Sequence, residues 1–184
     1  MKISILTTLL FISTASWATP ARIILIRHAE KTTDKTDIHL SAQGYQRAEA
    51  LRGLFDIHPD YASPTLPNHV FAAQYIPSKN SERCVETVTP LAQKLNLTVE
   101  TPYAEDQYKN LANELLSNPI YDGQVILIAW EHSILPSLAQ ALGNACAQTW
   151  DGAVFDRAWI LDYKNGQNVS CTDKPESVMP GDSQ

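Results

Sequence analysis

The stretch Ile23-Ile24-Leu25-Ile26-Arg27-His28 decides the fold class of this 184-residue chain. Its first four residues form an unbroken apolar run rich in β-branched side chains, which is typical of a strand buried on both faces of a parallel sheet. Arg27 and His28 come where this strand should end, and open α/β folds bind ligands at that edge of the sheet. Because a guanidinium can hold an anion and an imidazole can act as a nucleophile or base, the pair suits phosphoryl transfer.

The same pattern occurs a second time, about a hundred residues further along the chain. Residues 125–129 form another unbroken apolar run, and Trp130-Glu131-His132 follows it directly. In a parallel sheet the carboxyl ends of both strands lie at one edge, so the two imidazoles could face each other. A single histidine in such a place is more often a helix cap or a surface residue. Two such strand ends in one small domain favour a shared site.

The remaining pattern alternates between strands and helices. Apolar positions recur with helical spacing over residues 41–55, 81–95, 107–116 and 134–142. Short strands are predicted over residues 70–73, 97–100 and 153–162, and a type I′ turn at Asn165-Gly166 leads into a last short strand that ends at Cys171. This alternation predicts a three-layer α/β/α sandwich with a mainly parallel central sheet.

Both ends of the chain are expected to lie outside this fold. Residues 1–18 combine a positive start at Lys2, a short apolar stretch and small residues around Ala18, which indicates a secretory signal peptide. The apolar stretch is too short to cross a bilayer, so no membrane insertion is expected after cleavage. We therefore expect a signal at residues 1–18, one domain at 19–172 and a flexible tail at 173–184, in a periplasmic or secreted protein.

Export implies an oxidising compartment, which bears on the three cysteines. Cys146 and Cys171 both fall near loops in the last third of the chain and are the candidate disulfide. Cys84 lies at core spacing in a predicted helix and is expected to be a buried free thiol. The alternative is that all three are reduced packing residues. No cysteine or histidine cluster has the spacing of a metal site, so neither a metal nor another cofactor is expected.

The charge of the chain excludes one class of partner. Its formal net charge is −6 and it has no cluster of Lys or Arg, whereas nucleic-acid binding needs a basic surface.

A further cation is of interest because it falls in the first turn of a predicted helix. Arg83 lies there, where free backbone N–H groups already favour anions. The alternative is an ordinary exposed arginine paired with Glu82 or Glu86.

At this point the chain resembles the histidine phosphatase superfamily, whose hallmark is Arg-His-Gly at the end of the first strand. Four dispersed segments carry the resemblance in the family's order: Leu25-Ile26-Arg27-His28-Ala29-Glu30, Leu40-Ser41-x-x-Gly44-x-x-Arg47-Ala48-x-x-Leu51, Ser81-x-Arg83-Cys84-x-x-Thr87 and Ile126-Leu127-Ile128-Ala129-Trp130-Glu131-His132. Ala29 departs from the usual glycine, and the stretch that usually precedes the second arginine is not evident.

The resemblance implies a role for each matching residue. His28 would be the nucleophile that forms a phosphohistidine, and Arg27, Arg83 and His132 would bind the phosphoryl group. The acid that protonates the leaving group is Glu105 by analogy with one branch of the family, or Glu131 by analogy with another. Each carboxylate could instead be a solvated surface group.

These observations predict a metal-independent phosphatase that hydrolyses phosphomonoesters outside the cytoplasm. The chain leaves little room for a cap, so an open crevice would take a small metabolite or a phosphate on a cell-envelope glycan. We expect a monomer with no nucleic-acid partner. The alternatives are a non-catalytic phosphate- or phosphosugar-binding protein on the same fold and, less favoured, a mutase.

Overall fold

The structure, a computed structural model, describes residues 19–143, 146 and 149–183. The predicted signal peptide at residues 1–18 lies outside the described residues. Among the helices of the described part, none is both long and apolar enough to cross a membrane.

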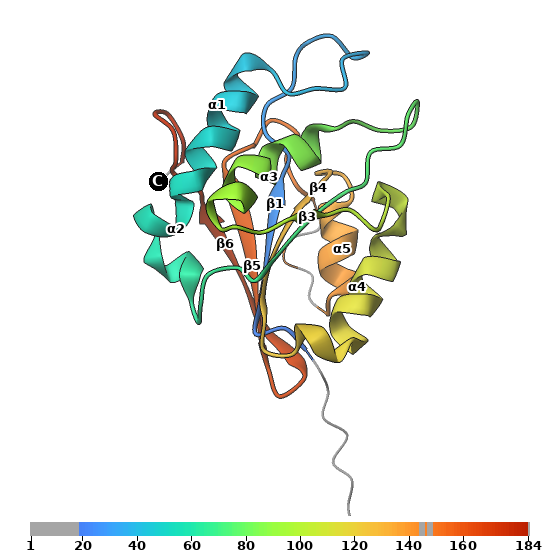
Figure 1. Ribbon diagram of the computed structural model, residues 1–184, viewed down its shortest axis with the longest axis vertical. Helices are drawn as coiled ribbons and strands as arrows, with labels where there is room; N and C mark the ends of the chain where they lie inside the picture. The colour runs from blue at the N-terminus through green and yellow to red at the C-terminus, as the bar shows by residue number, and fades with distance from the viewer. Residues whose placement is uncertain (1–18, 144–145, 147–148, 184) are drawn as a thin grey trace, which may run out of the picture.

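A six-stranded sheet forms the centre of the molecule (Figure 1). In chain order its strands are β1 (Arg22–Arg27), β2 (His69–Ala72), β3 (Val99–Glu100), β4 (Val125–Trp130), β5 (Arg157–Lys164) and β6 (Gln167–Pro175). Their order in the sheet is β3-β2-β4-β1-β5-β6. The first four strands run parallel, and β5 pairs antiparallel with both β1 and β6.

Helices cover both faces of this sheet, as the alternating sequence pattern predicted. They are α1 (Ala42–Ala50), α2 (Leu54–Ile57), α3 (Arg83–Lys94), α4 (Tyr108–Ser117) and α5 (Leu135–Ala141). Single turns of 3₁₀ helix occupy Leu51–Gly53, Pro59–Ala62, Glu105–Gln107 and Pro119–Tyr121. Helix α1 packs on α3 and α4 packs on α5, and the two pairs lie on opposite faces (Figure 1). This is the arrangement that right-handed crossovers produce when the chain moves first toward β3 and then back across the sheet. The predicted three-layer fold is confirmed.

The two apolar runs that predicted the fold are the central strands β1 and β4. Ile23, Ile24, Leu25 and Ile26 are fully buried, and so are all residues of β4. Because helices cover both faces, the side chains between the ends of these strands must be apolar, which explains why neither run alternates with polar residues. Ile26 lies opposite Ala129, and Arg27 lies opposite Trp130. The two strands therefore end side by side.

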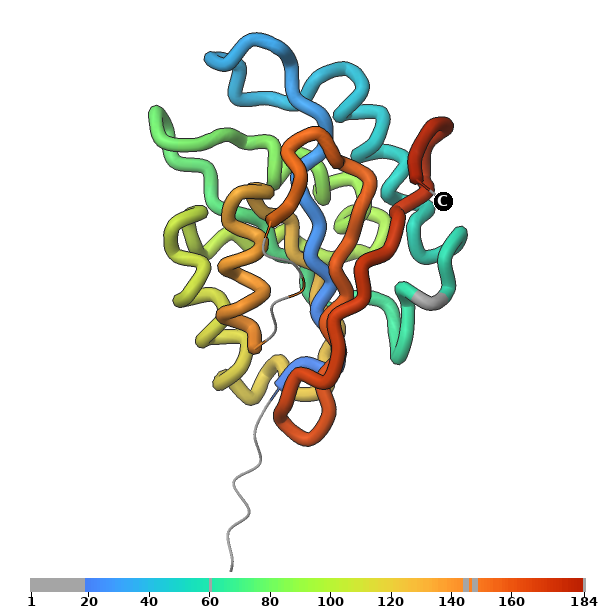
Figure 2. The backbone as a smooth tube through the Cα atoms, turned by 180° about the vertical axis from the view of Figure 1, so that it is seen from behind, coloured from blue at the N-terminus to red at the C-terminus, as the bar shows by residue number. Residues whose placement is uncertain are grey.

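The C-terminal third differs from the sequence prediction at two points. The strand expected over residues 153–162 begins only at Arg157, and residues 151–156 form a loop at the carboxyl edge of β1 (Figure 2). The turn at Asn165-Gly166 is as predicted, since both residues have the positive φ that a type I′ turn needs. The strand after it, β6, continues to Pro175, beyond the predicted end at Cys171.

The flexible tail predicted over residues 173–184 is wrong for its described part. After β6 the chain turns back onto α1, as the dark red segment of Figure 2 shows. Glu176 is only 1% exposed, and Asp182 forms an ion pair of 2.8 Å with Arg47. Arg47 is itself buried and also pairs with Glu30 at 2.8 Å. A buried guanidinium needs counter-charges, and the C-terminal segment supplies one through Asp182. Glu176 of the same segment lies 3.5 Å from Arg47, and burial raises its pKa well above the usual value.

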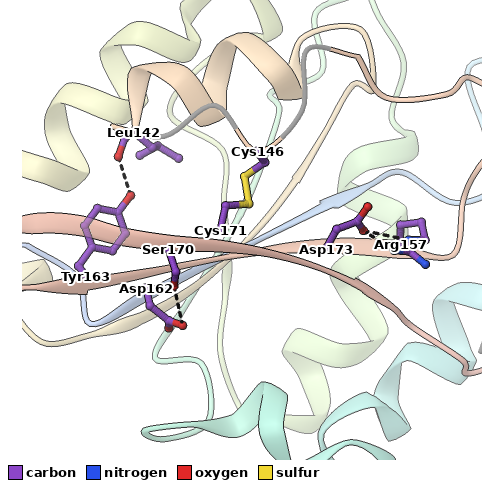
Figure 3. The surroundings of a disulfide bond; sticks show 8 residues. All are labelled: Leu142, Cys146, Arg157, Asp162, Tyr163, Ser170, Cys171 and Asp173. Atoms are coloured by element: carbon purple, nitrogen blue, oxygen red, sulfur yellow. Dashed lines mark hydrogen bonds and ion pairs between the residues drawn. A yellow bond between two sulfur atoms is a disulfide. The ribbon is translucent and has the colours of Figure 1, made fainter.

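A disulfide joins Cys146 to Cys171, the pair favoured by the sequence (Figure 3). It ties the segment after α5 to β6, and the 25-residue separation corresponds to roughly 3 kcal/mol of stabilisation in the chain-entropy account. Cys84 is a free thiol on α3, as expected, and burial raises its pKa well above the usual value. A thiol held in this protonated form is a packing group and a poor nucleophile.

The approach of α1 to the segment after β1 predicts an unequal cost for two glycine substitutions. A Cβ at Gly44 would lie 2.2 Å from the backbone oxygen of Glu30, whereas one at Gly53 would meet only the flexible tip of Ile57 at 3.3 Å. Gly44→Ala should lower the free energy of unfolding by about 3 kcal/mol or more, because backbone must move. Gly53→Ala should change it by less than about 0.5 kcal/mol. Urea denaturation measures both, and equal effects would contradict this packing.

Candidate active site

The nucleophile candidate His28 lies directly after β1 and is fully buried. Its Nδ1 is 2.7 Å from the carbonyl oxygen of Ala29. A carbonyl only accepts hydrogen bonds, so Nδ1 must be the donor. In the neutral ring the lone pair then belongs to Nε2, and this is the nitrogen that can attack.

Arg27 is held by a loop that lies beside the end of β1. Its Nη1 donates to the carbonyl oxygens of Gly152 at 2.7 Å and Val154 at 3.1 Å, and its guanidinium carbon lies 3.8 Å from the ring centre of Phe155. Burial lowers the pKa of Arg27 to about 10, which leaves the group cationic at neutral pH. Its Nε and Nη2 have no hydrogen-bond partner among the described residues. These two donors remain for a ligand.

Glu131 connects the two imidazoles. One of its carboxylate oxygens, Oε2, lies 3.0 Å from Nε2 of His28, and the other, Oε1, contacts Nδ1 of His132. The two histidines, 104 positions apart in the sequence, thus meet the two oxygens of one anion. This is the convergence that the paired strand ends predicted.

Arg83 reaches the same region from the start of α3. Its Nη1 donates to the carbonyl oxygen of Asp37 at 2.8 Å, and its Nε has no partner among the described residues. Together with Glu105 and Glu131 it lines a cavity of about 420 Å³. Helix α3 is fixed to the first strand by Thr87, whose Oγ1 accepts a hydrogen bond of 2.8 Å from the backbone N–H of Ala29. Both arginines and both histidines of the sequence prediction therefore lie around one site.

The two carboxylates of the site have opposite pKa shifts. Burial and the negative charge of Glu131 raise the pKa of Glu105 to about 7. Glu131 is also buried, which disfavours its charge, but its contact with His28 and the nearby His132 and Arg27 outweigh burial and lower its pKa to about 2. At pH 7 Glu105 is therefore protonated in about half of the molecules, while Glu131 is ionised. When two acids in one site are driven apart in this way, the environment assigns them different roles.

Two further features concern His132 and metal binding. Burial lowers the pKa of His132, which favours its neutral ring at physiological pH. The ligand atoms of His28, Glu131 and His132 lie within 4.8 Å of one another, as do those of His39, Glu82 and Glu86. These triplets are the places in the described residues where a metal could bind, and the first uses the atoms that would contact a phosphoryl group.

The loop over residues 151–156 is the part of the site that sequence reasoning missed. It supplies the carbonyls that hold Arg27, and a Cβ at Gly152 would come within 3.1 Å of Nε2 of His132. A side chain at this position would require the ring of His132 to shift by a few tenths of an ångström, so Gly152 was the available signal. This signal was missed because the sequence pattern predicts one strand over residues 153–162 and so leaves no room for a loop after Gly152.

Comparison with known proteins identifies the fold. No family model and no curated protein matches the sequence. Among solved structures, the protein histidine phosphatase SixA complexed with tungstate superposes with a TM-score of 0.52 at 13% identity, covering 84% of this chain and 97% of that one. A mycobacterial glucosyl-3-phosphoglycerate phosphatase gives 0.52 at 12% identity, with coverages of 84% and 97%. A phosphoglycerate mutase from Bacillus anthracis gives 0.50 at 13% identity, with coverages of 86% and 94%.

The chain has the histidine phosphatase fold. Within this fold the departure at Ala29 is accommodated, because its side chain is fully buried beside α3 and its N–H is bound by Thr87. Glu105 lies in the 3₁₀ turn before α4, and its backbone oxygen accepts a hydrogen bond of 3.2 Å from the indole of Trp130. The last residue of β4 thus holds the turn that carries this acid.

The raised pKa of Glu105 predicts a pH-dependent effect on stability. The unfolded chain releases this proton near pH 4.5 and the folded protein near pH 7, so folded stability falls between these values and stays lowered above them. Glu105→Gln removes the penalty. It should raise the melting temperature at about pH 8 and leave it unchanged at about pH 4.

The control for this prediction is Glu49→Gln, which neutralises an exposed carboxylate on α1. Thermal unfolding followed by circular dichroism at both pH values provides the measurement. A melting temperature of Glu105→Gln that stays at or below that of the unmodified protein at about pH 8 would mean that Glu105 is ionised there at no cost.

Proposed function

We propose that this protein is a metal-independent phosphomonoesterase that works through a phosphohistidine on His28. The observation that carries the proposal is the contact of both imidazoles with the two oxygens of Glu131. This carboxylate stands where two anionic oxygens of a phosphoryl group would bind, so a substrate displaces it from His28. The fold supports the proposal, and the SixA structure that shares it is a complex with tungstate.

In the first step, Nε2 of His28 attacks phosphorus while the bond from phosphorus to the leaving oxygen breaks. The hydrogen bond from Nδ1 to Ala29 holds the ring in the tautomer that makes Nε2 nucleophilic. The free donors of Arg27, with Arg83 and His132, surround the equatorial oxygens. Phosphoryl transfer needs positioning and positive charge more than covalent assistance, and these residues supply both without a metal ion.

Glu105 donates a proton to the leaving oxygen. Its pKa of about 7 matches this task, whereas Glu131, with a pKa of about 2, has no proton to give at neutral pH. In the second step the carboxylate of Glu105 takes a proton from water, the water oxygen attacks phosphorus, and the bond to Nε2 breaks. Inorganic phosphate leaves, and Glu105 is protonated again for the next cycle.

The proposed site of action and substrate are supported by the sequence and by the position of the cavity. The signal predicted at residues 1–18 supports action in the periplasm or outside the cell. A single disulfide suits an oxidising compartment. The cavity opens to solvent between loops, and this supports a small phosphorylated metabolite or a phosphate on a cell-envelope glycan as substrate.

The nucleophile is tested with a generic aryl phosphate in buffer that contains EDTA. The unmodified protein should turn the substrate over, and His28→Ala should reduce kcat by about 10³-fold or more because the covalent route is lost. Protein denatured in alkali during turnover should carry one phosphoryl group on His28 by mass spectrometry.

The matched control is His69→Ala, which removes a histidine paired with Glu100 on the neighbouring strands. It should keep the activity. If neither the unmodified protein nor the variants hydrolyse the aryl phosphate but calorimetry shows phosphate binding, the protein is a phosphate-binding module and the proposed activity is wrong.

The acid is tested by comparing leaving groups. An alkyl leaving group needs protonation and an aryl one needs little, so Glu105→Gln should lower kcat for an alkyl phosphate by about 10²-fold or more and spare the aryl phosphate. Glu131→Gln should not show this selectivity. The assignment fails if Glu131→Gln shows the selective loss and Glu105→Gln does not.

A further inference from the structure

The cavity beside Arg83 has an unusual charge for this protein. The chain as a whole carries a net charge of −6. Three lysines nevertheless line this one cavity, Lys31 and Lys35 from the loop after β1 and Lys79 from the loop before α3. Both loops extend from the edge of the sheet where β1 and β4 end (Figures 1 and 2).

The side chains of these three lysines have no protein partner among the described residues. Among the described residues, no ion pair or side-chain hydrogen bond is found for any of the three, whereas some other cations are paired. Lys94 binds Asp56, Arg22 binds Asp162 and Arg157 binds Asp173. Three lysines without such a partner, on two separate loops around one cavity, leave a positive surface open to a ligand.

The carboxylates of the same cavity do not cancel this charge. They belong to Asp37, Glu105 and Glu131. Four cationic side chains line the cavity, because Arg83 adds to the three lysines, so the cations outnumber these three carboxylates. Burial raises the pKa of Glu105 to about 7, so this carboxyl is ionised in only about half of the molecules at pH 7.

A reacting phosphoryl group does not require these lysines. Arg27, Arg83 and the two imidazoles already surround its position at the sheet edge, while the lysines lie on the outer loops. We propose that Lys31, Lys35 and Lys79 bind a second anionic group of the substrate, a phosphoryl or a carboxylate group remote from the bond that is cleaved. This inference rests on the proposed function and narrows the substrate to phosphomonoesters with a further negative charge.

Three probes of equal chain length test it: butyl phosphate, butanediol bisphosphate and carboxypropyl phosphate. Each exposed lysine contact is worth a few-fold at most, so the three together should raise kcat/KM for an anionic probe by about tenfold over butyl phosphate. The advantage should shrink as salt is added. Comparison of the bisphosphate with the carboxylate shows which second group the cavity prefers.

The decisive variant is Lys31→Gln/Lys35→Gln/Lys79→Gln. It should abolish the advantage of the anionic probes and leave butyl phosphate and an aryl phosphate unchanged. The matched control, Lys94→Gln/Lys109→Gln/Lys164→Gln, removes the same charge from exposed lysines that do not line the cavity, and it should retain the advantage. Loss of the advantage in both variants, or its absence in the unmodified protein, overturns the inference.

A binding measurement separates this inference from the proposed function. Calorimetry of butanediol bisphosphate with the His28→Ala protein needs no turnover, and adding the three cavity substitutions should weaken binding about tenfold. If the aryl phosphate is not hydrolysed but this difference is seen, the proposed activity fails and the anion site stands. If hydrolysis is seen and the difference is absent, the anion site fails alone.

Discussion

The parallel pairing of β1 with β4 is the constraint on which the rest of the structure depends. Arg27 lies opposite Trp130, so the residues that follow, His28 on one strand and Glu131 and His132 on the other, emerge side by side. The backbone N–H of His28 still donates to the carbonyl oxygen of Trp130, at 3.3 Å, one step beyond the ladder. A shift of one residue in this register would turn each of these side chains to the face of the sheet opposite the one it now occupies. The site is therefore as rigid as the central sheet that holds it.

The antiparallel strands β5 and β6 position the loop and the C-terminal segment that hold Arg27 and Arg47. Strand β5 begins only after the loop that binds Arg27, and the C-terminal segment beyond β6 lies against the same loop, because the N–H of Glu176 donates to the carbonyl oxygen of Asp156 at 2.8 Å. That segment also neutralises Arg47 on α1. Burial lowers the pKa of Arg27 but leaves it charged, since the loop carbonyls and the ring of Phe155 replace part of its hydration. A cation fixed in this way costs no reorganisation when an anion arrives.

Local patterns were enough to predict the fold and the approach of His28 to His132 at one edge of the sheet. A buried strand can be predicted from a run of consecutive apolar residues, and His28 and His132 lie directly after two such runs. The acid is different, because the properties of Glu105 depend on burial and on the charge of Glu131, which is distant in the sequence and close in space. The C-terminal segment was mispredicted for a related reason. Its polar composition suggests solvent, and only the distant Arg47 gives Glu176 and Asp182 a reason to be buried.

Under the proposed function, the contrast between fixed and peripheral cations explains how this site would select a substrate. Arginines and imidazoles at strand and helix ends are preorganised for the reacting group, which every phosphomonoester presents in the same form. These residues would accelerate the reaction, but they would discriminate poorly between different phosphomonoesters. The lysines on the loops after β1 and before α3 contact whatever extends beyond that group, and their flexible side chains tolerate several positions of a second anion. Selection by charge then needs no enclosing cap, and the same loops could change specificity without disturbing the edge of the sheet where the chemistry takes place.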